Sequence, residues 1–201
     1  MVLANRLGIQ SATELAQTEE KVTKQRAKQF YDEQVIDTVA VGTFAGLAEI
    51  HRYLFVDIYD FAGKIRDVNI AKGQFSFAPM MYLKPSLAYI DQLPHHTYEE
   101  IITKYVEMNV AHPFREGNGR SMRIWLDLML KASLHQIVDW SQVDKEDYLL
   151  AMARSPIKDV ELTVLLKGAL TNDVNNRDLY MKGLDQSYYY EGYTTYLIND
   201  L

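Results

Sequence analysis

The sequence of 201 residues contains no cysteine. A disulfide, a thiolate metal site and a cysteine nucleophile are therefore excluded. No run of apolar residues approaches the roughly 20 residues that a membrane-spanning helix needs. The first six residues also lack the basic start and apolar run of a signal peptide. We therefore expect a cytoplasmic protein with no membrane partner.

An excess of positive charge is missing too, since the formal net charge is -6 at pH 7. Binding to a nucleic-acid backbone requires clustered lysine and arginine, so we expect no direct nucleic-acid partner, and instead a small molecule or another protein. Hydrophobic residues (48%) and charged residues (24%) occur at the levels of an ordinary globular protein. The length predicts a single domain over residues 1–201.

Capping signals predict a mainly helical, all-α fold. A capping box of Ser11 and Glu14 opens a helix that reaches about Asp32. The other predicted helices begin after Thr43 (ending at Gly63), after Thr97, after Gly119, after Asp144 and after Asp159.

Residues 64–79 break the helical pattern because their apolar residues alternate, with Lys72 and Gly73 between the two halves. This alternation predicts one small β-hairpin. An isolated hairpin is only marginally stable. It is either a surface element packed by Phe75 and Phe77 or an element with a function of its own.

Residues 112–120 read His-Pro-Phe-Arg-Glu-Gly-Asn-Gly-Arg, and Arg123 follows one turn later. The proline ends the preceding helix, and the glycines allow close backbone approach to a ligand at the start of the next one. A helix N-terminus favours an anion. Arg120 and Arg123 lie three apart on one face of the first turn, where Arg123 is expected to be exposed, and both add positive charge suited to phosphate. The segment therefore predicts a polyphosphate site.

His112 and Glu116 flank this site. Histidine can accept a proton near neutral pH, and a carboxylate beside phosphates is how Mg²⁺ is usually held. Each residue alone has an ordinary structural explanation, but the whole string is far more specific. The sequence contains neither a Walker P-loop nor an H-E-x-x-H zinc motif.

The string matches the Fic family motif, H-P-F-x-[DE]-G-N-G-R-x-x-R, at every specified position. Residues 61–66 (Phe-Ala-Gly-Lys-Ile-Arg) also resemble the stretch before the family's hairpin, called the flap. The resemblance implies a Fic core over about residues 42–155, with residues 64–79 as the flap. It further implies a protein adenylyltransferase, which transfers AMP from ATP to a tyrosine, serine or threonine hydroxyl of a target protein.

The resemblance also implies a role for each motif residue. His112 is expected to be the general base, and Glu116 the Mg²⁺ ligand. The residues expected to bind the nucleotide phosphates are Gly117, Asn118 (through its amide), Gly119, Arg120 and Arg123. Relatives that transfer phosphate carry lysine at position 119, so the glycine here favours AMP transfer. Lys72 and Tyr148 are expected in the nucleotide pocket from their approximate position alone.

A second match lies in the C-terminal segment, about residues 183–201. Ser187 to Gly192 (Ser-Tyr-Tyr-Tyr-Glu-Gly) resembles the family's inhibitory motif, [ST]-x-x-x-E-[GN], in the small bacterial subclass that carries its own inhibitory helix. Ser187, Glu191 and Gly192 are its matching positions. Glu191 is then expected to form a bidentate pair with Arg123, in the place of the γ-phosphate.

Two other functions remain open. Glu191 can instead position water for removal of AMP, alone or alongside transfer, and the chain can be a non-catalytic nucleotide-sensing module. Family analogy suggests a topoisomerase subunit as the target. Self-association is a further expectation, as is self-modification at Tyr188, Tyr189 or Tyr190.

Overall fold

The structure is a computed structural model that describes residues 2–73 and 75–201. Met1 lies outside the described residues, as does Gln74 of the predicted hairpin. Within this part of the chain the α-helices are α1 (Ala12–Asp32), α2 (Phe44–Phe55), α3 (Leu83–Gln92), α4 (Tyr98–Ala111), α5 (Asn118–Leu134), α6 (Lys145–Arg154), α7 (Val160–Lys167) and α8 (Arg177–Tyr190). β1 (Ala71–Lys72) pairs with β2 (Phe75–Ser76), and β3 (Ile137–Val138) with β4 (Leu170–Thr171), both antiparallel. The prediction of a mainly helical fold with a small hairpin is confirmed.

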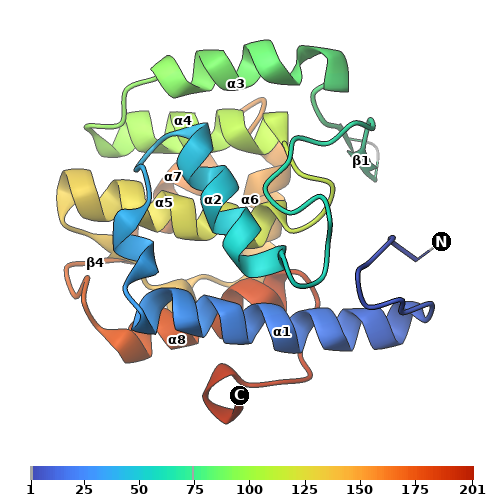
Figure 1. The fold of residues 1–201 in the computed structure, drawn as a ribbon. Coiled ribbons are helices and arrows are strands. Elements are labelled where there is room, and N and C mark those ends of the chain that lie inside the picture. Colours follow the sequence, from blue (N-terminus) through green and yellow to red (C-terminus); the bar gives the residue numbers. More distant parts are fainter. Residues whose placement is uncertain (1, 74) are drawn as a thin grey trace.

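Helix α5 lies at the centre of the molecule (Figure 1). It packs against α2 and α4, while α3 covers α4 on one side. α1 crosses the opposite side and packs against both α2 and α8, close to the C-terminus. Within the described part of the chain, no helix combines the length and apolar character needed to cross a bilayer.

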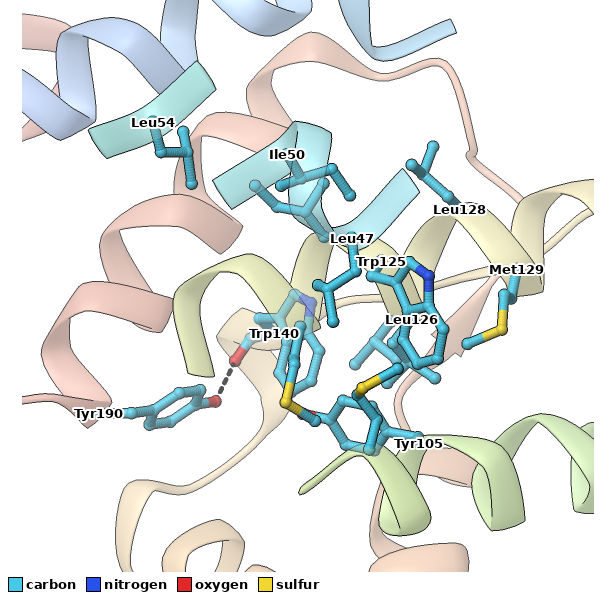
Figure 2. Packing of buried hydrophobic residues seen from close by; sticks show 14 of the residues in the cluster. Leu47, Ile50, Leu54, Tyr105, Trp125, Leu126, Leu128, Met129, Trp140 and Tyr190 are labelled. Carbon is cyan, nitrogen blue, oxygen red and sulfur yellow. Dashed lines mark hydrogen bonds between the residues drawn. The ribbon is translucent and has the colours of Figure 1, made fainter. Parts of the chain in front are cut away.

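The core explains why α5 is central. Trp125, Leu126 and Met129 are completely buried, and α5 packs against α2, whose Leu47 and Ile50 belong to the same buried cluster (Figure 2). Each large apolar side chain buried in this way contributes about 1.5–3 kcal/mol. The first turn of α5 is thereby fixed relative to α2 and α4.

The helix starts agree with the capping signals, but one predicted end is wrong. Thr97 and Glu100 form a reciprocal capping box, and Thr43 caps α2. Helix α2 ends at Phe55 rather than at Gly63. The apolar spacing misled the prediction because Ile58 is buried in the following turns although it is no longer helical. Gly63 has a φ of 75° in those turns.

The flap, residues 64–79, contains less strand than predicted. Arg66 holds its base, because the buried guanidinium donates hydrogen bonds to the carbonyls of His112, Val68, Ala78 and Ala111. These bonds attach both ends of the flap to the C-terminal end of α4. The β3–β4 pair was not predicted, since two-residue strands carry no readable alternation.

Asp127 of α5 attaches the β3 segment to the core. Its carboxylate accepts hydrogen bonds from the backbone N–H of Val138 (2.9 Å) and the indole N–H of Trp140 (2.8 Å). Burial raises the pKa of Asp127 from its ordinary 3.8 to about 7.

We expect Asp127 to make the folded state less stable as the pH rises. The folded protein holds this proton more tightly than the unfolded chain does. The stabilisation that protonated Asp127 gives the folded state is therefore complete below about pH 4, and it is lost as the pH rises through about 7. Urea unfolding of the wild type and Asp127→Asn across this window measures it. The difference between their free energies of unfolding should fall with pH, and a constant difference would contradict the shift. The slope is diagnostic because asparagine also removes an acceptor, which lowers stability at every pH.

Candidate active site

The loop of residues 112–117 joins α4 to α5. His112 caps α4 with a φ of 50° and donates its backbone N–H to Met108. Gly117 precedes α5 with a φ of 79°, and a Cβ there would lie 2.4 Å from the ring of Phe55. Only glycine fits this position without displacing the ring. The loop thus ends at a helix N-terminus, as the sequence predicts.

Phe114 anchors this loop in the core. Its side chain is fully buried and stacks on His51, with 3.9 Å between the ring centroids. The amide of Asn118 accepts from the backbone N–H of Phe114 (2.9 Å) and donates to its carbonyl (2.7 Å). The Asn118 amide therefore closes the loop, and its contact with phosphate stays a prediction.

His51 also supports the loop, although no sequence motif marks it. Gly63 donates its N–H to Nδ1 (2.8 Å), so Nε2 carries the hydrogen and donates to the carbonyl of Glu116 (2.8 Å). Burial lowers the pKa of His51 to about 3, which keeps the ring neutral. A histidine on the buried face of α2 thus fixes the backbone that carries Glu116.

A cleft of about 670 Å³ lies between the flap, this loop, α4, α6 and the end of α8. Most of the site residues expected from the sequence line it: His112, Glu116, Gly117, Asn118, Gly119, Arg120, Arg123, Lys72, Tyr148 and Glu191. Ser187 and Gly192 do not line the cleft, and lie behind it on α8 and just after that helix.

His112 sits in this cleft beneath the flap. The ring of Phe77 stacks on it, with centroids 3.7 Å apart and planes 16° from parallel. Burial lowers the pKa of His112 to about 4. The imidazole is therefore neutral at pH 7, and its low pKa makes it a weaker proton acceptor here than an exposed histidine.

Arg120 is buried, with 2% of its surface accessible. Its guanidinium forms ion pairs with Glu19 (2.6 Å) and Glu116 (3.1 Å). The rings of Phe55, Tyr188 and Tyr193 surround it. The two carboxylates neutralise most of the positive charge of Arg120 that was expected to face phosphate. Of these side chains, Glu116 is the one open to the cleft, with 41% of its side chain exposed.

Glu19 was missed by the sequence analysis because it lies on α1, far from the motif. It also accepts hydrogen bonds from the hydroxyls of Tyr59 and Tyr193. Nothing in the local sequence distinguishes it from the other acidic residues of that polar helix. Only the packing of α1 against α2 and α8 shows that it reaches the site.

We expect Glu19→Gln to lower the free energy of unfolding by about 3 kcal/mol, because it leaves Arg120 with a buried charge that is only partly compensated. Urea denaturation at pH 7 measures the change. Glu161→Gln is the matched control, since Glu161 pairs with Arg154 on the exposed surface, where a pair contributes less than about 1 kcal/mol. Equal losses of stability from the two substitutions would show that the buried ion pair stabilises the fold no more than an exposed one.

Arg123 is likewise buried, with 3% of its surface accessible, which corrects the expectation of an exposed cationic face. Its Nη2 donates to Glu191 Oε1 (2.7 Å) and to the carbonyl of Ser187 (2.9 Å), and its Nε donates to Ser187 Oγ (2.7 Å). The pair with Glu191 is therefore a single hydrogen bond, not bidentate, and Ser187 supplies the other contacts. Burial opposes ionisation of Glu191, but Arg123 outweighs it and lowers the pKa of that carboxyl below its ordinary value.

Two glycines make this placement of Glu191 possible. A Cβ at Gly119 would lie 2.3 Å from Glu191 Oε1, so the carboxylate occupies the space that any side chain at 119 would need. Gly192 ends α8 with a φ of 88°. Glycine and asparagine are the residues that adopt this conformation most readily, which gives the last position of the C-terminal motif a physical reason.

The segment after Glu191 is bound to α1. The carboxylate of Glu20 accepts from the backbone N–H groups of Thr195 and Tyr196 (3.1 Å each). Lys24 is buried, pairs with Glu20 (3.2 Å) and donates to the carbonyl of Tyr196. Residues 195–196 therefore hold the end of α8 against α1.

The far end of the cleft is apolar, and no sequence motif indicated it. Its lining residues from and just after α6 are Leu149, Met152, Ala153 and Pro156. Tyr148 lies beside them, buried, with its hydroxyl bonded to that of Tyr105 (2.7 Å). Lys72 is exposed on β1, on the flap side of the same cleft.

Glu116 fits the chemistry of a magnesium ligand, since it is a partly exposed carboxylate in the cleft. The described residues contain no group of three potential metal ligands. A Mg²⁺ ion held by one carboxylate together with substrate phosphates does not require one.

Comparison with known proteins identifies the family. The sequence profile of the Fic/DOC family matches residues 43–130. The probable protein adenylyltransferase y4lH of Sinorhizobium fredii is 30% identical over 77% of this chain and 83% of its own length. The probable protein adenylyltransferase Fic of Salmonella typhimurium is 33% identical over 63% of this chain and 66% of its own length.

Solved structures agree on the fold. BepC of Bartonella tribocorum, with bound AMPPNP, superposes with a TM-score of 0.68 at 21% identity, over 85% of this chain and 93% of BepC. The N-terminal Fic domain of a Bartonella quintana protein, with bound ADP, has the same TM-score at 22% identity, over 85% of this chain and 91% of that one. On its motif, its fold and these relatives together, the chain belongs to the Fic/DOC family.

Proposed function

We propose that this protein transfers AMP from ATP to a tyrosine, serine or threonine hydroxyl of a target protein. The observation that carries the proposal is the placement of a neutral His112 and a partly exposed Glu116 in one cleft, beside the N-terminus of α5. Family relatives named as protein adenylyltransferases support the same chemistry.

In the proposed reaction, His112 removes the proton from the target hydroxyl. The hydroxyl oxygen then attacks the α-phosphorus, a new P–O bond forms, and pyrophosphate leaves with the electrons of the broken bond. Glu116 is the residue that would hold Mg²⁺, which neutralises phosphate charge when bound. The backbone N–H groups that open α5 stabilise the phosphate oxygens. Positioning and charge neutralisation, more than covalent help, are what such a reaction needs.

The two ends of the cleft suit the two substrates. The apolar end at Leu149 and Met152 suits an adenine ring, which lies flat against apolar groups. The flap covers His112 at the other end, through Phe77. An extended target segment can add to the flap by main-chain hydrogen bonds and so bring its hydroxyl to His112.

The chain is proposed to inhibit itself through Glu191. That carboxylate lies on Arg123, the arginine expected to bind the γ-phosphate. A triphosphate that enters the cleft then meets a negative charge in place of Arg123. Its α-phosphorus is displaced from the line of attack, so binding continues while transfer is slow.

Of the three tyrosines next to Glu191, Tyr189 is the best acceptor for self-modification. Tyr188 and Tyr190 are buried, and their hydroxyls bond to Thr23 and Val143 respectively. Tyr189 is 44% exposed. Any AMP found on this segment is therefore expected on Tyr189.

The test uses two labels of ATP. A Glu191→Gly variant is incubated with a cell lysate, Mg²⁺ and ATP labelled either at the α- or at the γ-phosphate. AMP transfer predicts protein labelling from the α-label alone. Labelling from the γ-label would mean phosphate transfer, and no labelling from either would favour a nucleotide-sensing module. The His112→Ala/Glu191→Gly double variant is the control for non-enzymatic labelling.

A further inference from the structure

A second cavity lies further along α5 than the catalytic cleft, and Arg123 lines both. Its volume is about 350 Å³, and it is enclosed by the end of α1, by α5, by the β3 segment and by α8. Most of the lining is apolar, including Ile124, Trp140, Tyr180 and Leu184. A volume and lining of this kind are typical of a site for a small organic molecule.

One charge in this cavity lacks a counter-charge. The lining groups that form ion pairs are Asp32 with Arg177 (2.7 Å), Asp37 with Lys131 (4.0 Å) and Arg123 with Glu191 (2.7 Å). Asp127 forms no ion pair within residues 2–73 and 75–201, and its two hydrogen bonds come from the neutral donors Val138 and Trp140. A carboxylate offers about four acceptor positions, so part of its capacity remains free.

An uncompensated carboxylate in an apolar cavity is costly to ionise. The pKa of Asp127, raised by burial to about 7, is the expected consequence. A cation placed against it removes this cost, whereas an anion adds to it. The chemistry of the cavity therefore selects for a positive ligand with an apolar body.

We propose that this cavity binds a small primary amine carried on an aromatic or apolar group, with its ammonium against Asp127 and its ring beside Trp140. An ammonium group has three donors, which suit the free positions of the carboxylate. Trp140 and Tyr180 offer aromatic surfaces of the kind that amines with apolar bodies contact.

The ligand also stabilises the position of α8. Gly183, Leu184 and Ser187 of that helix line the cavity, and Ser187 accepts a hydrogen bond from Arg123 (2.7 Å). A ligand that binds this arrangement shifts the population toward it. Hydrogen exchange of the α8 backbone therefore slows when the cavity is filled.

Benzylamine is a suitable probe, and the two tryptophans of the chain provide the readout. The indole N–H of Trp140 donates to Asp127, whereas that of Trp125 donates to the carbonyl of Thr43 (3.0 Å) and lies outside the cavity lining. In a titration of ¹⁵N-labelled protein, benzylamine should shift the Trp140 indole signal saturably and leave that of Trp125 unchanged. Backbone exchange over residues 180–187 should slow in the same samples.

Benzyl alcohol has the same ring without the charge, and it should bind at least about tenfold more weakly, the factor that a single charge-assisted contact supplies. Asp127→Asn should reduce benzylamine binding to the level of the alcohol. If that variant does not fold, the comparison of amine and alcohol on the wild type decides. The proposal is overturned if benzylamine gives no saturable shift at millimolar concentration, if both indole signals move together, or if the alcohol binds as well as the amine.

Discussion

Glu191→Gly is expected to raise the initial rate of AMP transfer about a hundredfold, because removal of the carboxylate lets the γ-phosphate reach Arg123 and brings the α-phosphorus back into line. Misplacement of reacting atoms by about 1 Å is enough to account for a factor of this size. The affinity for ATP should change little, since inhibition acts on alignment. The measurement is incorporation of α-labelled AMP, together with ATP binding by calorimetry.

Two comparisons separate this mechanism from a general loosening of the C-terminal segment. Arg123→Ala should not copy the activation, because it removes the proposed γ-phosphate ligand together with the anchor of Glu191. Disrupting the tail instead, by Glu20→Gln, should activate less than Glu191→Gly, because Ser187 still binds Arg123. If Glu191→Gly is no faster than the wild type, the C-terminal motif is a packing element only.

His112→Ala, made in the activated Glu191→Gly background, should lower transfer by about 10²–10⁴-fold, the range for loss of a general base. ATP binding should persist, because no phosphate contact is assigned to this ring. A double variant that transfers AMP at the rate of Glu191→Gly would remove His112 from the mechanism.

His135→Ala is the matched control for this substitution. His135 caps α5 with a φ of 54°, as His112 caps α4 with a φ of 50°, so alanine meets similar backbone strain at both positions. His135 is exposed and lies outside the lining of the cleft. Its replacement should leave transfer unchanged, which separates loss of the base from strain at a helix end.

The part of the site that is contiguous in sequence was predictable. The order of proline, glycines and arginines between His112 and Arg123 fixes a turn followed by a helix N-terminus, and the structure has both. The helix starts were predictable for the same reason, since capping depends on residues only three apart. Local chemistry is sufficient where the contacts are local.

The remaining features depend on packing between distant segments. Glu19 meets Arg120 only because α1 packs against α2 and α8, and His51 meets Glu116 only because α2 packs beneath the loop. The burial of Arg123 was also missed, because charged residues at a helix start are usually solvated. No pattern along the chain pairs Glu19 with Arg120, whereas the C-terminal motif did pair Glu191 with Arg123.

The close approach of Gly119 and Glu191 limits how the two positions can change during evolution. A first carbon added at position 119 falls on the carboxylate oxygen at 191, which Arg123 holds in place. A mutation there must displace the glutamate, even in a gene that still encodes it. Lineages that change the chemistry of position 119 are therefore expected to lose the restraint of the C-terminal helix in the same mutational step. Within the family, a residue other than glycine at position 119 and an inhibitory glutamate at position 191 should rarely occur in the same protein.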